Sequence, residues 1–209
     1  LATCGYPPRD FLEFDDFIHS CYEVIDRLCE LSHNIAIIVG SPTKNPSPDG
    51  KNLHNSVLFL YEGNIKYTQH KTLLPTYDVF DEYRHFEPTK QWGIVEHHGV
   101  KIALTVCEDI WDVGTNDPLY TCVPLDNMMA HQPHIIINVS ASPFHYNHAK
   151  ERIDIVKANM QRYGIPMFYI NHVGAQTELI FDGGSLVSCP NGNIFDEMPY
   201  FEECIRHYE

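Results

Sequence analysis

Apolar residues early in the chain recur every three or four positions. From Phe14 to Cys29 this spacing places them on one face of a helix, with charged residues on the other face. We expect this helix to begin at Asp10 or Glu13 and to end at Asn34. Such a face has to pack against another element, so the pattern also predicts a sheet or helix beneath it.

The same spacing returns twice later in the chain. It predicts helices over residues 118–130 and 149–163. Pro118 suits the first turn of the earlier helix, because proline has no N–H to lose there. Gly164 suits the end of the later helix, because glycine adopts the left-handed conformation that closes a helix.

Shorter apolar runs predict strands. They cover residues 35–39, 56–61, 65–69, 93–96, 100–106, 134–139, 167–170, 179–181, 185–188 and 193–195. Gly40 is expected to end the first strand and residues 41–54 to form a loop. Glu62-Gly63-Asn64 and His97-His98-Gly99 suit hairpin turns, and Asp182-Gly183-Gly184-Ser185 suits a turn before a strand.

Helices that alternate with strands and hairpins predict a mixed sheet covered by helices. We therefore expect one α/β domain over residues 1–209, in which the last three strands form a closing meander. With 44% hydrophobic residues the chain can bury a sizeable core.

The charge of the chain excludes some functions. Lys and Arg total 14 against 28 acidic residues, a net charge of -14 that repels nucleic-acid phosphates and anionic membranes. No apolar run approaches the roughly 18 residues of a membrane span. The seven cysteines are an odd number and widely spaced, which favours a reducing, cytoplasmic setting. Two histidine pairs, His131/His134 and His145/His148, lack a neighbouring carboxylate ligand, so we expect no metal site.

The strand over residues 100–106 leads directly into Cys107, Glu108 and Asp109. A strand that delivers a thiol to the edge of a sheet is a common way to present a catalytic nucleophile. Cysteine is also among the most often buried residues, and an inert, structural Cys107 is the alternative.

Lys71 follows another predicted strand and is the second residue of a long stretch rich in aromatic and acidic residues, 70–88. Loops of this length without regular structure are often functional. A fixed ammonium beside a thiol lowers the pKa of that thiol and stabilises an oxyanion. The alternative is a surface lysine in a solvated loop.

Together these stretches resemble the nitrilase superfamily, and within it the glutaminase domains of glutamine-dependent NAD synthetases. The resemblance covers nearly the whole chain. The first two matching segments are Lys71, Leu74, Pro75, Tyr77, Phe80, Glu82, Arg84 and Phe86, and Thr105-Val106-Cys107-Glu108-Asp109-Ile110-Trp111. The others are Gly5-Tyr6-Pro7-Pro8, residues 138–144 (Asn-Val-Ser-Ala-Ser-Pro-Phe) and residues 171–185.

This resemblance implies an αββα sandwich with a Glu–Lys–Cys triad. Cys107 would attack the side-chain amide of L-glutamine, and water would hydrolyse the resulting thioester. Lys71 and the backbone N–H of Glu108 would hold the oxyanion. Glu82 would be the additional glutamate beside Lys71, although a solvated loop acid is the alternative.

For the glutamine pocket the resemblance implies Tyr77, Phe80, Glu108, Ser142 and His148. Glu108 would take the α-ammonium. His148 stands where the family often has a basic residue, with His145 and Lys150 as rivals.

In the family the general-base glutamate precedes the Gly-Tyr-Pro turn, so we expect it ahead of Leu1 and expect these 209 residues alone to be nearly inactive. A synthetase domain that binds ATP, magnesium and nicotinic acid adenine dinucleotide is expected C-terminal to them. No phosphate-binding loop is visible here, so no cofactor is expected in this segment. The expected partners are L-glutamine, that synthetase domain and further copies of the chain.

Two other functions stay open from the sequence. One is a stand-alone nitrilase-type amidase or carbamoylase. The other is a catalytically silent domain used for assembly.

Overall fold

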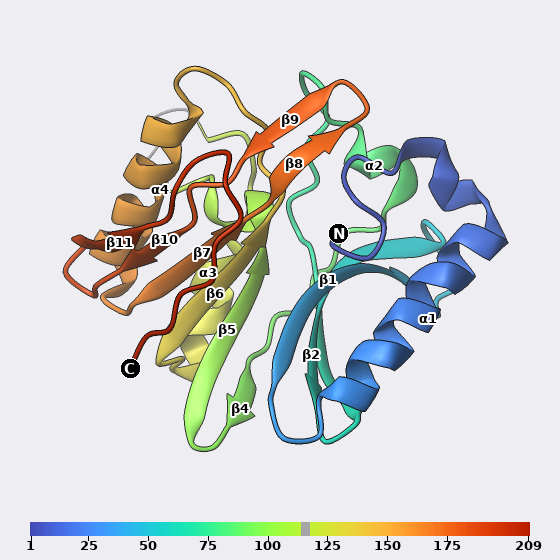
Figure 1. Ribbon diagram of the computed structural model, residues 1–209, viewed down its shortest axis with the longest axis horizontal. Helices are drawn as coiled ribbons and strands as arrows, with labels where there is room; N and C mark the ends of the chain where they lie inside the picture. The colour runs from blue at the N-terminus through green and yellow to red at the C-terminus, as the bar shows by residue number, and fades with distance from the viewer. Residues whose placement is uncertain (114–117) are drawn as a thin grey trace.

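Helix α1 (Asp15–Leu31) lies along the outer face of a three-stranded antiparallel sheet (Figure 1). The strands of this sheet are β1 (Ile37–Lys44), β2 (Leu53–Tyr61) and β3 (Asn64–His70), in that order. The computed structural model describes residues 1–113 and 118–209 of the chain. Helix α1, strand β1 and the hairpin of β2 and β3 correspond to the first helix, strand and hairpin that the sequence predicts.

The apolar face predicted for α1 is the face that packs on this sheet. Ile25 and Cys29 contact Leu58 and Leu60 of β2, and all four side chains are buried. Full burial of a large apolar side chain contributes roughly 1.5–3 kcal/mol. Packing against the sheet therefore stabilises α1 more than its helix propensity does.

A six-stranded mixed sheet forms the second half of the fold, in the order β11-β10-β7-β6-β5-β4. The central strands β5, β6 and β7 are parallel, and the outer pairs are antiparallel. The strands are β4 (Val95–His97), β5 (Val100–Val106), β6 (Ile135–Ser140), β7 (Met167–Asn171), β10 (Leu186–Ser188) and β11 (Ile194–Glu197).

Helices α3 (Pro124–Met128) and α4 (His148–Tyr163) cover the outer face of the larger sheet. Val156 and Met160 of α4 are fully buried there with Ala103 and Ile136 of the sheet. Helix α4 ends at Gly164, whose φ of 67° is the left-handed conformation that the sequence predicts for this cap.

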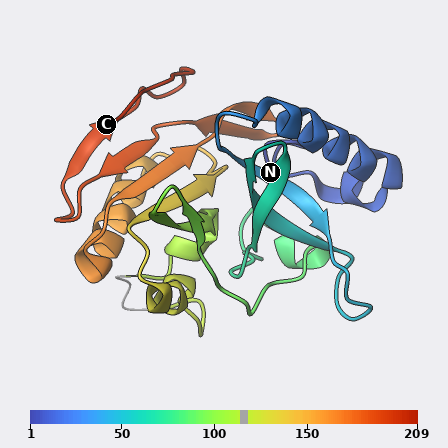
Figure 2. The same ribbon diagram turned by 90° about the horizontal axis from the view of Figure 1, so that it is seen from below.

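The two sheets pack against each other, with α1 and α4 on opposite outer sides (Figure 2). Successive residues of β5 point to alternate layers. Ile102 and Leu104 pack toward Val57 and Phe59 of the smaller sheet, while Ala103 packs toward the helices. The layers thus run helix, sheet, sheet, helix, which confirms the predicted αββα sandwich.

Smaller elements complete the chain. The hairpin of β8 (Val173–Gln176) and β9 (Leu179–Asp182) forms a sheet of its own. The short helices are η1 (Arg9–Glu13), α2 (Glu82–His85), η2 (Cys107–Ile110) and η3 (Met129–His131). Across the described residues, no helix has both the length and the apolar character needed to cross a membrane.

Several predicted boundaries were wrong. Helix α1 begins at Asp15, not at Asp10 or Glu13, and ends at Leu31, not at Asn34. Gly40 does not end its strand: β1 continues to Lys44, because its polar half pairs with β2 through the backbone. Gly40 is required there by a close approach, since a Cβ would lie 2.7 Å from the Leu1 nitrogen. The helix expected over residues 118–130 is only α3 followed by η3, and Pro124, not Pro118, occupies its first turn.

The predicted closing meander was also wrong in part. The strand near residues 179–181 is β9, and it pairs with β8, for which the sequence gives no apolar pattern. Backbone hydrogen bonds hold that hairpin, so side-chain periodicity could not predict it.

Candidate active site

Cys107 stands at the carboxyl end of the central strand β5, where the chain turns into η2. Its φ is 43°, a left-handed conformation that is unusual for a residue other than glycine. Such a conformation costs about 1–3 kcal/mol and persists only where the surroundings impose it. The sharp turn places the thiol at the end of the sheet, as the sequence predicts for a nucleophile.

Lys71 is the first residue after β3 in the other sheet, and its side chain is 1% exposed. Its Nζ lies 2.7 Å from Oε1 of Glu82, which is 5% exposed. Burial opposes the charge on Lys71, but Glu82, Cys107 and Glu108 together favour it, so the pKa of Lys71 is raised. A permanent ammonium is therefore fixed inside the site.

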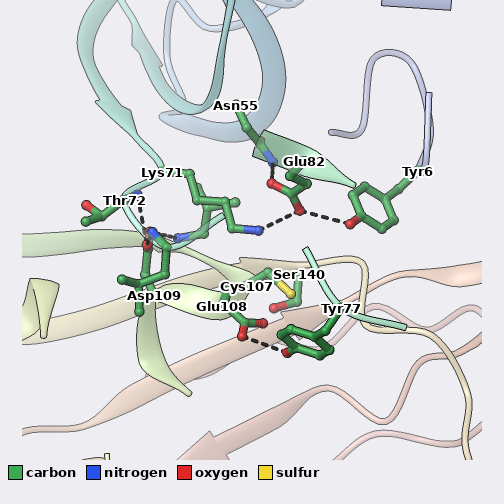
Figure 3. Close-up of polar contacts among 12 residues, drawn as sticks. Tyr6, Asn55, Lys71, Thr72, Tyr77, Glu82, Cys107, Glu108, Asp109 and Ser140 are labelled. Atoms are coloured by element: carbon green, nitrogen blue, oxygen red, sulfur yellow. Dashed lines mark hydrogen bonds and ion pairs between the residues drawn. The ribbon is translucent and has the colours of Figure 1, made fainter. Parts of the chain in front are cut away.

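Glu82 has two further hydrogen-bond donors (Figure 3). The Tyr6 hydroxyl donates to Oε1 at 2.9 Å, and Asn55 Nδ2 donates to Oε2 at 3.1 Å. These contacts hold the carboxylate in one orientation. Glu82 is therefore not a solvated loop acid but a buried partner of Lys71, as the resemblance implied.

Cys107, Lys71 and Glu82 line one small cavity together with Tyr6 and Asn55. The volume of this cavity is about 10 Å³, room for roughly one water molecule. Burial raises the pKa of the Cys107 thiol, and the Lys71 ammonium opposes that shift. Since the pKa stays raised, the resting nucleophile is a thiol, and a base has to take its proton when it attacks.

Asp109 joins the segment of the lysine to the segment of the cysteine. Its Oδ1 accepts the backbone N–H groups of Thr72 and Leu73, both at 2.9 Å. Its Oδ2 accepts the N–H of Val106 at 3.1 Å. Burial raises the pKa of Asp109 to about 6, and these hydrogen bonds oppose the shift. One buried carboxylate thus aligns Lys71 with Cys107 across the two sheets.

Ser140 and Asn138, on the neighbouring strand β6, complete the surroundings of the nucleophile. Ser140 lies beside the sulfur of Cys107 (Figure 3) and donates to Asn138 Oδ1 at 2.6 Å. Asn138 Nδ2 donates to Thr105 Oγ1 at 2.9 Å and to the Cys107 carbonyl oxygen at 3.3 Å. Sequence reasoning missed both residues. Both residues lie at the carboxyl end of the predicted strand that follows the strand of Cys107. Parallel strands end at the same edge of a sheet, so this position could have indicated that they lie near the nucleophile.

Glu108 is 5% exposed, and one of its carboxylate oxygens accepts hydrogen bonds from two tyrosine hydroxyls. Tyr77 donates to Oε1 at 2.7 Å and Tyr120 at 3.1 Å. Burial raises the pKa of Glu108, and Lys71 and the two phenols oppose the shift. The predicted pair of Tyr77 and Glu108 is therefore brought together, whereas Tyr120 was not among the predicted site residues.

The other predicted pocket residues lie in this region with different partners. The Phe80 ring centroid is 5.4 Å from that of Tyr77. Ser142 is buried, and its N–H donates to Asn171 Oδ1 at 2.9 Å. These contacts place Phe80 beside the tyrosine of the predicted pocket and fix the loop that carries Ser142.

His148 opens α4 and, like Tyr77, Phe80, Glu108 and Ser142, it is not among the residues that line the small cavity. Its Nδ1 lies 2.9 Å from the Pro143 carbonyl oxygen, and its ring centroid is 5.8 Å from that of Trp111. Of its two rivals, Lys150 forms an exposed ion pair with Asp154, and the His145 ring lies 5.3 Å from the His148 ring.

A profile of the family described as "Carbon-nitrogen hydrolase" matches residues 1–207. The chain belongs to the carbon-nitrogen hydrolase family. This confirms the superfamily predicted from the residues around Lys71 and Cys107.

Two curated relatives of this carbon-nitrogen hydrolase domain carry the name glutamine-dependent NAD(+) synthetase. The protein of Synechocystis sp. is 36% identical over 209 residues, which cover 97% of this chain and 38% of that protein. The protein of Aquifex aeolicus is 32% identical over 205 residues, which cover 98% of this chain and 34% of that protein. The chain thus spans about a third of the length of the relatives it matches.

Solved structures of related proteins share the fold. Glutamine-dependent NAD+ synthetase from Acinetobacter baumannii, in complex with ADP, superposes with a TM-score of 0.84 at 28% identity. The superposition covers 96% of this chain and 36% of the synthetase chain. An amidase from Nesterenkonia sp. has a TM-score of 0.73 at 20% identity, with 93% of this chain and 69% of that chain covered. The sandwich is thus common to a synthetase and an amidase.

Proposed function

We propose that this domain is the glutaminase of a glutamine-dependent NAD synthetase. It would hydrolyse the side-chain amide of L-glutamine through a Cys107 thioester and supply ammonia for the amidation of nicotinic acid adenine dinucleotide. The observation that carries the proposal is the buried Lys71–Glu82 pair in one cavity with Cys107, beside a carboxylate at Glu108. The names of the relatives support the substrate and the product.

Each chemical step has a residue in this arrangement. A base removes the thiol proton as the sulfur of Cys107 bonds to the amide carbon. The carbonyl oxygen becomes an oxyanion between the Lys71 ammonium and the backbone N–H of Glu108. The C–N bond then breaks, and ammonia leaves with the proton. Water attacks the thioester in the same way, releasing glutamate and the Cys107 thiol.

The glutamine pocket would use the predicted residues. We propose that Glu108 binds the α-ammonium and that Tyr77 and Phe80 form one wall. Ser142 and His148 would contribute from the loop before α4. Since the small cavity has room for roughly one water molecule, glutamine binding requires the lining to move apart.

The general base in this proposal is none of the three carboxylates described near Cys107. Asp109 already accepts three backbone N–H groups. Glu82 already accepts bonds from Lys71, Tyr6 and Asn55, and Glu108 accepts two phenols. The resemblance supplies the base from a glutamate before the Gly5-Tyr6-Pro7 turn. We therefore propose that these 209 residues alone turn over glutamine slowly.

The remaining partners belong to the same proposal. ATP, magnesium and nicotinic acid adenine dinucleotide would be bound by a synthetase domain C-terminal to residues 1–209. We propose that copies of the protein assemble into homo-oligomers. A cytoplasmic location is supported by the seven cysteines, all of which are free thiols.

The test uses the natural protein with whatever sequence flanks this domain. Cys107→Ala is expected to abolish NAD formation driven by glutamine and to leave NAD formation driven by added ammonia intact. Retention of glutamine-driven activity would overturn the mechanism. Hydrolysis of simple amides in preference to glutamine would favour the stand-alone amidase. An intact protein that never uses glutamine would favour the assembly domain.

A further inference from the structure

Tyr120 lies outside the motifs that identify the site, yet its hydroxyl reaches the carboxylate next to the nucleophile. Its Oη donates to Oε1 of Glu108 at 3.1 Å, the same oxygen that accepts the Tyr77 hydroxyl at 2.7 Å. Two donors on one oxygen restrict rotation of the carboxylate. Within residues 1–113 and 118–209, both hydrogen bonds to the Glu108 carboxylate go to Oε1.

The protonation states of the three groups suit this arrangement. Burial raises the pKa values of both tyrosines, and the neighbouring Glu108 raises them further. Both phenols therefore stay protonated at neutral pH and act as donors. For Glu108, hydrogen bonds from the phenols favour the charged form that burial disfavours. Tyr120 thus helps to keep a buried carboxylate ionised.

The backbone of Tyr120 is anchored to the turn that follows the nucleophile. Its N–H donates to Oδ2 of Asp112 at 3.2 Å, and the N–H of Leu119 donates to Oδ1 at 2.9 Å. Asp112 comes directly after the Trp111 that caps η2. The position of the Tyr120 phenol is therefore tied to the segment that carries Cys107 and Glu108.

We propose that Tyr120 is a positioning residue for substrate selection. Together with Tyr77 it holds Glu108 ionised and oriented, so that Oε2 receives the α-ammonium of an amino-acid amide. This inference rests on the proposed glutaminase function and deepens it. It predicts that Tyr120 matters for amides that carry an α-ammonium and not for amides that lack one.

The experiment compares two substrates in the natural protein and its Tyr120→Phe variant. L-Glutamine carries the α-ammonium; glutaramate keeps the amide and the carboxylate but has no amino group. For glutamine we expect kcat/KM to fall about tenfold, mainly through KM, the size expected for a lost hydrogen bond to a charged group. For glutaramate we expect no change, so the preference for glutamine falls by the same factor.

A pH profile gives a second readout that a structural role would not move. Loss of one donor raises the pKa of Glu108, so the acid limb of kcat/KM for glutamine should shift to higher pH in Tyr120→Phe. Tyr163→Phe is the matched control, because it removes a solvent-exposed phenol–carboxylate hydrogen bond of 2.9 Å, to Asp126, away from Cys107. Neither the substrate preference nor the profile should change in that control.

Binding to the inactive protein separates this inference from the proposed function. Calorimetry measures L-glutamine binding to Cys107→Ala and to Cys107→Ala/Tyr120→Phe. Weaker binding to the double variant supports the inference. Equal binding to both overturns it and leaves the glutaminase function standing, as does an equal loss of kcat/KM for both substrates. No glutamine binding to Cys107→Ala overturns the glutaminase function and the inference with it.

Discussion

Oδ1 of Asp109 accepts the backbone N–H of Leu73 at 2.9 Å, which links the two sheets at the active site. Leu73 belongs to the stretch that follows Lys71, whereas Asp109 belongs to the turn that carries Cys107. The residues are 36 positions apart in the sequence. The distance between the ammonium and the thiol therefore depends on a carboxylate that takes no part in the chemistry.

Asp109→Asn should weaken this link. The asparagine side chain has the same volume, but an NH2 group replaces one carboxylate oxygen. This NH2 donor then faces the backbone N–H of Val106, or those of Thr72 and Leu73, and has no acceptor. An unsatisfied buried donor costs about 1–3 kcal/mol, so the free energy of unfolding in urea should fall by that amount. Glutaminase kcat should fall with it, because Lys71 and Cys107 lose their alignment.

The control for this variant is Asp26→Asn on the exposed face of α1. It should change neither the free energy of unfolding nor kcat. If the free energy of unfolding of Asp109→Asn equals that of the wild type, the three hydrogen bonds make no net contribution to stability.

Lys71 should control the reactivity of the thiol. Burial raises the pKa of Cys107 and the Lys71 ammonium lowers it, so Lys71→Met should raise this pKa further. Only the thiolate reacts with iodoacetamide, so alkylation should accelerate with rising pH and should be slower in Lys71→Met at pH 8. Each pKa unit lowers the thiolate fraction about tenfold.

Mass spectrometry of the alkylated protein contains its own control. Cys204 is exposed, and its rate should be the same in both proteins. If the ratio of Cys107 to Cys204 labelling is unchanged in Lys71→Met, the ammonium does not act on the thiol.

The Asp182-Gly183-Gly184 turn contains a buried ion pair. Arg152 of α4 is 1% exposed and donates to both carboxylate oxygens of Asp182, with Nη1 at 2.8 Å from Oδ1. Arg152→Met leaves the carboxylate buried without its partner, which should cost about 3–5 kcal/mol in urea unfolding. Arg152→Met/Asp182→Asn should recover part of that loss, because no buried charge remains.

Arg162→Met on the same helix is the matched control. Arg162 pairs with Asp126, but both side chains are about half exposed. Its loss should cost about 0–1 kcal/mol. Equal costs for Arg152→Met and Arg162→Met would mean that burial of the first pair has no energetic consequence.

Local patterns predicted the elements that depend on neighbours in the sequence. The apolar faces of α1 and α4 are the predicted ones, since a helix places residues three and four apart together. The hairpin of β2 and β3 also formed where predicted, with Glu62 and Gly63 at φ values of 51° and 74°. In contrast, the polar end of β1 and the strand β8 depend on pairing with a partner strand.

The sequence by itself determined that Cys107 follows a buried strand and that Lys71 lies in an aromatic and acidic loop. Its motifs determined the family. Only the tertiary structure brought Lys71, Glu82 and Cys107 into one cavity and added Tyr6, Asn55, Ser140 and Tyr120 around them. The physical reason is that these side chains come from separate segments of both sheets. Their proximity results from packing and long-range hydrogen bonds, such as those of Asp109, which no local pattern contains.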